Sequence, residues 1–426
     1  MRYNPLPSRL FKDNRKRLFD RIPDNSVVIL NSNDLMPKNA DQLMPFIQNS
    51  DLYYLSGIDQ EETILVLIKE KETLQEFLFI RETNETIKIW EGEKLSKEQA
   101  KKQSGIQEVW WTKDFNGKIN AIIPNLKNIY LNSNEHPRAD VVVESRDARF
   151  KKLIKKQYPS HNFKKISSVL YGLRSIKSAP EIDAIQVACD ITNKGVSRVL
   201  SKLKPGIYEY EIEAEIIHEF LTNRATGFAY EPIIASGSNA CILHYNTNNA
   251  RCKDGDVILM DFGAEYANYS SDLTRCFPVN GKFTKRQKEV YNSVLRVMNG
   301  AKKILKPGVF LFDYEKDVGK LMEKELVELG LISMKDIRNQ KETPAYKKYY
   351  MHGTSHHLGL DVHDVSDPEK PLATNMVLTC EPGIYIPEEG LGIRLENDIL
   401  ITENGNIDLM QDIPIEPDEI EQLINI

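Results

Sequence analysis

Four of the eight histidines in the chain lie within twelve residues, in the segment HGTSHHLGLDVHD: His352, His356, His357 and His363. Gly353 and Gly359 in the same segment allow the backbone to turn sharply around them. A single histidine is more often a hydrogen-bonded core residue than a ligand. Four histidines so close together, combined with the acids described next, indicate that at least one of them binds a metal ion.

Two similar segments each end an apolar run with an acid. Asp261 follows VILM in DVILMDFG, and Glu381 follows MVLTC in NMVLTCEPG. Each segment continues through a tyrosine and a turn to a second acid, which is Asp272 in SSDLTRCF and Glu396 in IRLENDIL. A carboxylate at the end of a buried strand must be paired, hydrogen-bonded or metal-bound to tolerate the loss of water. The repeat predicts two similar strand pairs in a pseudo-symmetric sheet, with four acids converging at its centre.

Four carboxylates and a histidine form a set rich in hard oxygen ligands. Such a set suits two divalent ions, for example Mn²⁺, Co²⁺ or Zn²⁺, better than one structural zinc ion. Two ions roughly 3.5–4 Å apart can share a hydroxide and polarise a carbonyl group together. The residue types therefore favour metal-assisted hydrolysis.

The segment that precedes these motifs has strong helix signals. Ser178 is placed to cap a helix, with Glu181 three residues later. A long amphipathic pattern follows and stops at Lys204-Pro205-Gly206, and a second helix is expected from about Tyr208 to Asn223.

The N-terminal part of the chain alternates apolar runs with helix-prone segments. The runs are Val27–Leu30, Thr63–Ile68 and Glu76–Arg81, and Lys94–Gln103 is charged and helix-prone. This alternation predicts an α/β domain. The pattern changes around Tyr171, so we expect an N-terminal domain over residues 1–173 and a catalytic domain over residues 174–426.

The composition excludes several classes of protein. The length of 426 residues predicts two domains, and 41% apolar with 28% charged residues is ordinary for a globular protein. The net charge of −6 argues against a nucleic-acid partner. No apolar run reaches the length of a membrane span, and the polar N-terminus lacks a signal core, so we expect a cytoplasmic protein without a membrane partner. The five cysteines lack a C-x-x-C spacing and are expected to be reduced: Cys189, Cys241, Cys252, Cys276 and Cys380.

Six segments together resemble one family. They read CILHY, GDVILMDFGAEY, SSDLTRCFPVNGKFT, HGTSHHLGLDVHD, LTCEPGIYI and GIRLEND. The chain is similar over almost its whole length to the pita-bread metallopeptidases, and within them to the aminopeptidase P branch. The resemblance implies a mixed α/β protein with a C-terminal pita-bread domain, which has a pseudo-twofold sheet, after a smaller creatinase-like α/β domain.

The resemblance also implies the metal ligands. The five ligand positions of the family fall on Asp261, Asp272, His356, Glu381 and Glu396. Asp272 and Glu396 would bridge two ions together with a water-derived hydroxide, the nucleophile. Asp261 would bind one ion, and His356 and Glu381 the other. Glu381 would also shuttle the proton.

Further roles follow from the same resemblance. His244 in CILHYN and His363 in DVHD match the histidines that hold the substrate carbonyl and stabilise its developing negative charge. Arg394 and Tyr385 match the pair that supports proton transfer.

Four residues match substrate-binding positions. His352 would line a pocket for a proline ring, with Tyr230 and Val362 nearby. Asp41, in the less similar N-terminal domain, would anchor the free amine of the substrate.

The activity implied is removal of the N-terminal residue from peptides whose second residue is proline. An Xaa-Pro bond has no N–H to donate, so a metal pair that activates the carbonyl directly suits it. Mn²⁺ is the expected cofactor, with Zn²⁺ or Co²⁺ as alternatives. The family also implies a homodimer or homotetramer, with Trp90 of the N-terminal domain reaching a neighbouring subunit.

Two other functions remain open on the sequence. An Xaa-Pro dipeptidase shares the fold and the metal site, although Ser355 stands where dipeptidases tend to have glycine. A non-catalytic homologue that binds peptides or proteins would have lost metal ligands, and this chain has kept all five. Asn397, which directly follows Glu396, stands where many relatives have a second acid.

Overall fold

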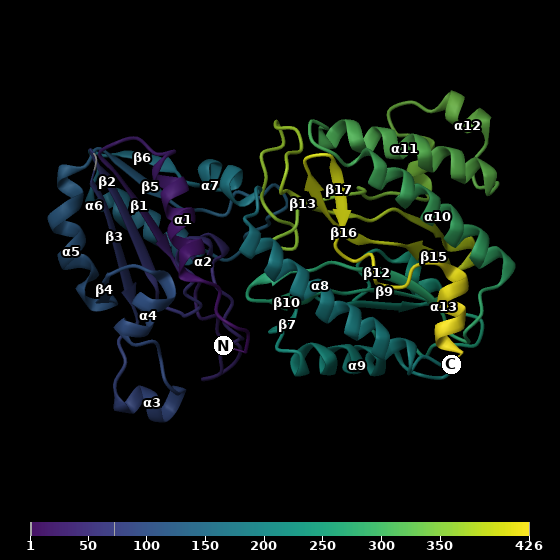
Figure 1. The fold of residues 1–426 in the computed structure, drawn as a ribbon, viewed down its shortest axis with the longest axis horizontal. Helices are drawn as coiled ribbons and strands as arrows, with labels where there is room; N and C mark the ends of the chain where they lie inside the picture. Colours follow the sequence, from purple (N-terminus) through teal and green to yellow (C-terminus); the bar gives the residue numbers. More distant parts are fainter. Residues whose placement is uncertain (1, 72, 426) are drawn as a thin grey trace. The chain divides into compact units, whose positions relative to one another are not determined.

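The structure of the protein is a computed structural model that describes residues 2–71 and 73–425. These residues form two compact units (Figure 1). The first unit comprises Pro5–Arg174. The second comprises residues 175–425 together with residues 2–4, at the start of the chain.

The first unit is built on one mixed sheet of six strands, in the order β4-β3-β2-β1-β5-β6. The strands are β1 (Ser26–Asn31), β2 (Ile64–Glu70), β3 (Thr73–Ile80), β4 (Glu108–Trp111), β5 (Asn128–Leu131) and β6 (Asn162–Lys165). β1, β2 and β3 pair antiparallel, whereas β4, β5 and β6 each join a neighbour in parallel. The central strand β1 is buried along its whole length, as its apolar run predicts.

Helices and turns surround this sheet. They are α1 (Ser8–Phe19), α2 (Ser50–Ser56), α3 (Glu85–Glu91), α4 (Lys97–Ser104), η1 (Thr112–Asp114), α5 (Phe115–Ile122), η2 (Ile123–Asn125), α6 (Arg146–Gln157) and α7 (Ser167–Arg174). Phe115 and Ile119 of α5 and Ile154 of α6 pack with Val27 and Ile29 of β1 in one apolar core. The first unit thus buries its own core.

In the second unit, two pairs of helices cover the strands, as Figure 1 shows. α8 (Ala179–Leu200) and α9 (Glu209–Thr222) form one pair, and α10 (Lys285–Ile304) and α11 (Leu311–Glu328) form the other. α8 begins as the sequence predicts, because the side chain of Glu181 accepts a hydrogen bond of 2.8 Å from the backbone N–H of Ser178. The shorter helices and turns are η3 (Gly237–Cys241), α12 (Met334–Asn339), η4 (Ala345–Lys348), η5 (Pro387–Glu389) and α13 (Pro417–Ile424).

The strands of the second unit are short. They are β7 (Gly227–Phe228), β8 (Ile233–Ser236), β9 (Val257–Asp261), β10 (Ala264–Tyr266), β11 (Tyr269–Ser270), β12 (Thr274–Pro278), β13 (Val377–Cys380), β14 (Gly383–Ile386), β15 (Leu391–Arg394), β16 (Asn397–Thr402) and β17 (Gly405–Asp408). β9 pairs with β8 and β12, and β16 pairs with β13 and β17. α8 contacts β10 and β11, while α10 contacts β13, β14 and β15. Each helix pair therefore covers its own group of strands.

The strand pairing shows two long hairpins, each with one interruption. In the first, Asp261 pairs with Thr274, and Glu265 pairs with Ser270 in the same register beyond the interruption. The second hairpin pairs Cys380 with Asn397 before its interruption and Gly383 with Arg394 after it, again in one register. The interruptions fall at residues 262–263 with 271–273, and at residues 381–382 with 395–396.

This register brings the acids to one face of each hairpin. It sets Glu381 opposite Glu396, and Asp272 opposite Gly263, two residues beyond Asp261. Directly opposite residues share a face, and so do residues two apart on one strand. A bridge between Thr274 and Glu396 then joins the two hairpins side by side. This bridge brings the acids of the two hairpins together.

Residues 2–4 contribute to the second unit. The backbone oxygen of Arg2 accepts a hydrogen bond of 2.7 Å from Nε of Arg224, and Nδ2 of Asn268 donates to the hydroxyl of Tyr3 at 3.1 Å. The ring of Tyr3 is buried and packs edge-on against Tyr266. Across residues 2–71 and 73–425, no helix combines the length and the apolar character that a membrane crossing requires.

The first prediction concerns Gly263, at the interruption of the first hairpin. A Cβ atom there would lie 1.7 Å from the backbone oxygen of Ser271, so Gly263→Ala must force the two strands apart. We expect a loss of about 1–3 kcal/mol or more, seen as a thermal midpoint lower by several degrees. Gly227→Ala is the control, because no neighbouring heavy atom lies within 4 Å of a Cβ at Gly227. Equal midpoints for both variants would contradict the close approach.

Candidate metal centre

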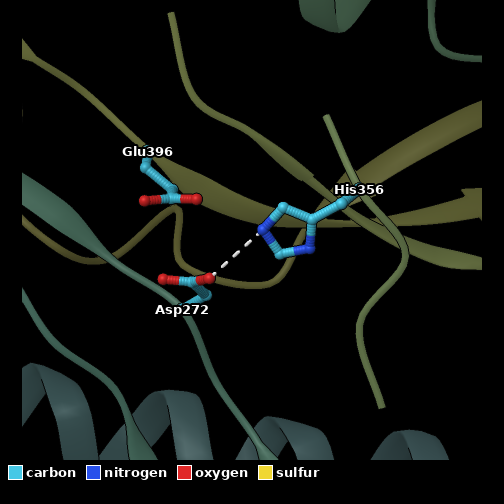
Figure 2. A group of neighbouring side chains, drawn as sticks. All are labelled: Asp272, His356 and Glu396. Carbon is cyan, nitrogen blue, oxygen red and sulfur yellow. Dashed lines mark ion pairs between the residues drawn. The ribbon is translucent and has the colours of Figure 1, made fainter. Parts of the chain in front are cut away.

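Asp272, His356 and Glu396 lie together at the junction of the two hairpins (Figure 2). One possible ligand atom from each lies within 4.8 Å of the others. Nε2 of His356 is 3.4 Å from Oδ2 of Asp272, the contact drawn as a dashed line in Figure 2. The three side chains come from separate segments, so only the folded chain brings them together.

Asp261 and Glu381 extend this group on two sides. Oε1 of Glu381 is 3.6 Å from Nε2 of His356. The hydroxyl of Tyr230 lies 2.6 Å from Oδ1 of Asp261 and 2.5 Å from Oδ1 of Asp272. All five residues that the sequence singled out as ligands are therefore neighbours in one continuous cluster.

His356 is aligned by the strand beside it. Residues 356–358 run antiparallel to β13: the backbone N–H of Thr379 donates to the oxygen of His356 at 2.9 Å, and that of Leu358 donates to Val377 at 3.0 Å. The backbone N–H of Glu381 donates to the oxygen of Thr354 at 2.8 Å. The imidazole and the Glu381 carboxyl are thus held on paired backbone segments.

A buried ion pair supports the histidine segment from the other side. Nζ of Lys177 lies 2.8 Å from Oδ2 of Asp364, and both side chains are almost completely buried. Gly359 leaves room for this pair, because a Cβ atom there would lie 2.2 Å from the same carboxylate oxygen. Removing one partner of such a pair is costly, since the other is left charged without compensation.

Arg394 links the acids to the rest of the site. Its guanidinium donates to Oδ2 of Asp261 at 2.5 Å, to the hydroxyl of Tyr385 at 2.8 Å and to Oγ1 of Thr274 at 3.1 Å. Thr274 in turn donates to Oε2 of Glu396 at 2.6 Å. Thr274 was missed in the sequence, although a signal existed: it stands two residues after Asp272, so a strand there places both side chains on one face.

The residues expected near a substrate differ in how closely they contact this cluster. Nε2 of His352 is 2.7 Å from the hydroxyl of Tyr385, and its Nδ1 is 3.6 Å from Oε2 of Glu381. The ring of His363 lies edge-on to that of His356, with 4.3 Å between centroids, and is exposed, while Val362 beside it is half-buried. The hydroxyl of Tyr230 contacts Asp261 and Asp272. The sequence predicted Tyr230 only as a neighbour of the proline pocket and did not predict these contacts.

His244 is exposed on the segment that follows η3. Burial first, then the charge of Arg394 and, more weakly, that of His244, lower the pKa of His352 to about 3. His352 is therefore a neutral imidazole at neutral pH, and His244 lies within electrostatic range of it.

Two predicted residues belong to the first unit. Asp41 is exposed in a turn closed by a bridge between Pro37 and Leu43. Trp90 is on α3 and exposes 82% of its surface. Their roles toward the substrate amine and a neighbouring subunit stay predictions.

The electrostatics of the cluster fit divalent cations. Burial raises the pKa of Glu381 to about 7, with further contributions from the charges of Asp272 and Asp261. Burial and neighbouring carboxylates also raise the pKa of Asp272 and of Glu396. Buried acids that repel one another become stable anions when a cation lies between them. Carboxylate oxygens with one imidazole are a donor set for Mn²⁺, Co²⁺ or Zn²⁺.

Comparisons with known proteins agree with this arrangement. Residues 183–403 match the model of metallopeptidase family M24, and residues 11–130 match the model of the aminopeptidase P N-terminal domain. The chain is 36% identical to the Xaa-Pro aminopeptidase of Haemophilus influenzae, over 99% of this chain and 98% of the relative. The chain belongs to the aminopeptidase P branch of metallopeptidase family M24. Its identity to the Escherichia coli Xaa-Pro aminopeptidase is also 36%, over 97% of both chains.

Solved structures of aminopeptidase P share the whole fold. The zinc-substituted Escherichia coli enzyme in complex with product superposes with a TM-score of 0.89, at 34% identity and 99% coverage of both chains. Proline aminopeptidase P II from Yersinia pestis has a TM-score of 0.88, at 33% identity, over 99% of this chain and 100% of that one. The predicted family and the predicted fold class are confirmed.

The second prediction concerns the pH dependence of metal binding. Because a ligand carboxyl must lose its proton, and because Glu381 has a pKa of about 7, metal binding weakens as the pH falls through 7. We expect the apparent affinity for Mn²⁺ to fall at least about tenfold between pH 8 and pH 6, the loss that one titrating ligand produces. Calorimetric titration of the metal-free protein at both pH values measures it. An affinity that is unchanged or higher at pH 6 would contradict the raised pKa.

Proposed function

We propose that the protein is an Xaa-Pro aminopeptidase that removes the N-terminal residue from peptides whose second residue is proline. The proposal rests on the convergence of Asp261, Asp272, His356, Glu381 and Glu396 in one cluster. The names of the full-length relatives support the substrate class. A protein that only binds peptides has no need to keep five such residues together in its interior.

We assign the metal ligands as the sequence predicts. Asp272 and Glu396 would serve both of two ions, Asp261 would hold one of them, and His356 and Glu381 would hold the other. When bound, the two ions would supply an activated water and polarise the scissile carbonyl. Arg394 and Thr274 hold the ligand carboxylates of Asp261 and Glu396 in fixed orientations.

Glu381 is suited to move the proton. As one of the carboxylates of the cluster, it can accept a proton from the attacking water and release it to the departing proline nitrogen. Its distance of 3.6 Å from His356 keeps it at the centre of the cluster.

His352, His244 and His363 act on the substrate. The low pKa of His352 leaves that ring uncharged, so it can lie against an apolar proline ring without the cost of burying a cation. His244 and His363 are the exposed imidazoles, and both can donate to the carbonyl oxygen as negative charge develops on it. The metal identity as Mn²⁺, the cytoplasmic location, the oligomeric state and the role of Asp41 stay predictions.

The third prediction tests the substrate class. We expect the Mn²⁺-loaded protein to release the first amino acid from Ala-Pro-Ala and longer Xaa-Pro peptides, and to leave Ala-Ala-Ala almost untouched. Chromatographic measurement of the released amino acid, with matched peptide concentrations, gives the rates. Cleavage of Ala-Pro alone would favour a dipeptidase, and no cleavage by metal-loaded protein would favour a non-catalytic binding protein.

The fourth prediction concerns Asp272. Asp272→Ala removes a ligand shared by both ions, so we expect turnover of Ala-Pro-Ala to fall by about a thousandfold or more, since such a metal centre stabilises the transition state by several kcal/mol. Bound metal, measured by atomic emission, should fall as well. Asp367→Ala is the matched control, because Asp367 lies near the surface and pairs with nearby Lys370 and with the backbone N–H of Glu369. An Asp272→Ala protein with ordinary activity would falsify the ligand assignment.

A further inference from the structure

Glu209, the first residue of α9, is a completely buried carboxylate outside the metal centre. Its oxygens accept five hydrogen bonds. Oε1 accepts from the backbone N–H of Ser236 at 2.7 Å, the Ser236 hydroxyl at 2.8 Å and Nδ2 of Asn239 at 3.2 Å. Oε2 accepts from the hydroxyl of Tyr245 at 2.8 Å and the backbone N–H of Ala250 at 2.8 Å.

All five donors belong to residues 236–250, which we call the substrate segment. Ser236 is the last residue of β8, and Ala250 begins the stretch that pairs again with residues 206–209. Between these two ends the substrate segment has one short turn, η3, and no strand partner within the described residues. Glu209 therefore joins both ends and the middle of a segment that secondary structure does not hold.

The substrate segment carries His244, to which the proposed function gives a role toward the substrate carbonyl. His244 is the residue immediately before Tyr245, whose hydroxyl Glu209 binds. Ala240 of the same segment packs on β15, where a Cβ atom at Gly392 would lie 2.2 Å from the Ala240 oxygen. β15 ends at Arg394, which binds Asp261. The segment is thus pinned between Glu209 on one side and the second hairpin on the other.

We propose that Glu209 is a positioning residue for catalysis, which holds the substrate segment so that the His244 imidazole stands ready for the substrate carbonyl. This rests on the proposed function and on the role of His244 in it. Glu209 touches neither the ligands nor His244 itself, and it acts through Ser236, Tyr245 and Ala250.

A purely structural role for Glu209 makes a different prediction. A buried carboxylate that only stabilised the fold would, when changed, lower the thermal midpoint and reduce activity regardless of which residue stands at position 244. A positioning residue loses its effect once the group that it positions is gone. A double-mutant cycle between Glu209 and His244 separates the two.

The test uses Glu209→Gln, which keeps the size of the side chain but places an amide N–H₂ against donors. With Ala-Pro-Ala we expect kcat to fall about tenfold to a hundredfold, with bound metal at the wild-type level. In a His244→Ala background, the same change should lower kcat by less than about threefold. Equal losses of kcat in both backgrounds would overturn the proposal.

Hydrogen exchange gives a readout that needs no turnover. In Glu209→Gln, amides of residues 236–250 should exchange at least tenfold faster, while β9, β13 and β16 keep their wild-type rates. Unchanged exchange in the substrate segment, or faster exchange over the whole second unit, would overturn the anchoring role. Glu215→Gln is the matched control on the same helix, because its carboxylate pairs with Arg198 of α8. We expect this change to leave the exchange rates of residues 236–250 unchanged, and to leave kcat unchanged in both the wild-type and the His244→Ala background.

The two proposals fail differently. If the wild-type protein cleaves no Xaa-Pro peptide, the proposed function is rejected, and with it the catalytic role of Glu209, even if the exchange result holds. If the wild-type protein cleaves Ala-Pro-Ala but the losses in the cycle are additive, only the role of Glu209 is rejected.

Discussion

Repulsion among four buried carboxylates is the constraint around which the second unit is organised. Asp261, Asp272 and Glu396 are buried, and Glu381 keeps only 18% of its side chain exposed. Burial therefore favours the protonated forms of Asp272, Glu381 and Glu396, whose pKa values are raised. The chain offsets part of this with donors: Arg394 for Asp261, Thr274 for Glu396, Tyr230 and His356 for Asp272. Divalent cations are the compensation that a site of this composition still calls for, and bound there they would also supply an activated water.

The cluster lies beside the interruptions of the two hairpins. Both hairpins keep their register across a gap of two or three residues, so the strands beyond each gap remain aligned, while Asp272, Glu381 and Glu396 fall in the gaps and Asp261 ends the strand before one. Placing the two gaps next to each other, through the bridge between Thr274 and Glu396, combines the acids of both hairpins. Paired strands on either side then position these carboxylates more accurately than flexible loops could.

Much of this could be predicted from local patterns. The capping pair Ser178 and Glu181, the apolar runs of β1, β9 and β13, and the alternating acids each depend on residues close in sequence. What could not be predicted depends on residues far apart. Lys177 and Asp364 are separated by 187 positions, and Glu209 and Ala250 by 41, so neither pairing leaves a periodic signal in the chain. Glu209 even resembles an ordinary acid in the first turn of a helix, where a solvated position is the usual expectation. Thr274 is the intermediate case, since strand alternation alone could have found it.

The docking of residues 2–4 on the second unit has a consequence for the order of events during synthesis. The partners of Arg2 and Tyr3 are at positions 224–268, so synthesis must pass these positions before residues 2–4 can find their place. The β-sheet of the first unit, complete by Lys165, can form well before then, because domains generally fold as units while the chain emerges. Residues 2–4 can therefore settle only after the sheet of the first unit has had time to form, and their attachment requires that the segment around Arg224 and Tyr266 is in place.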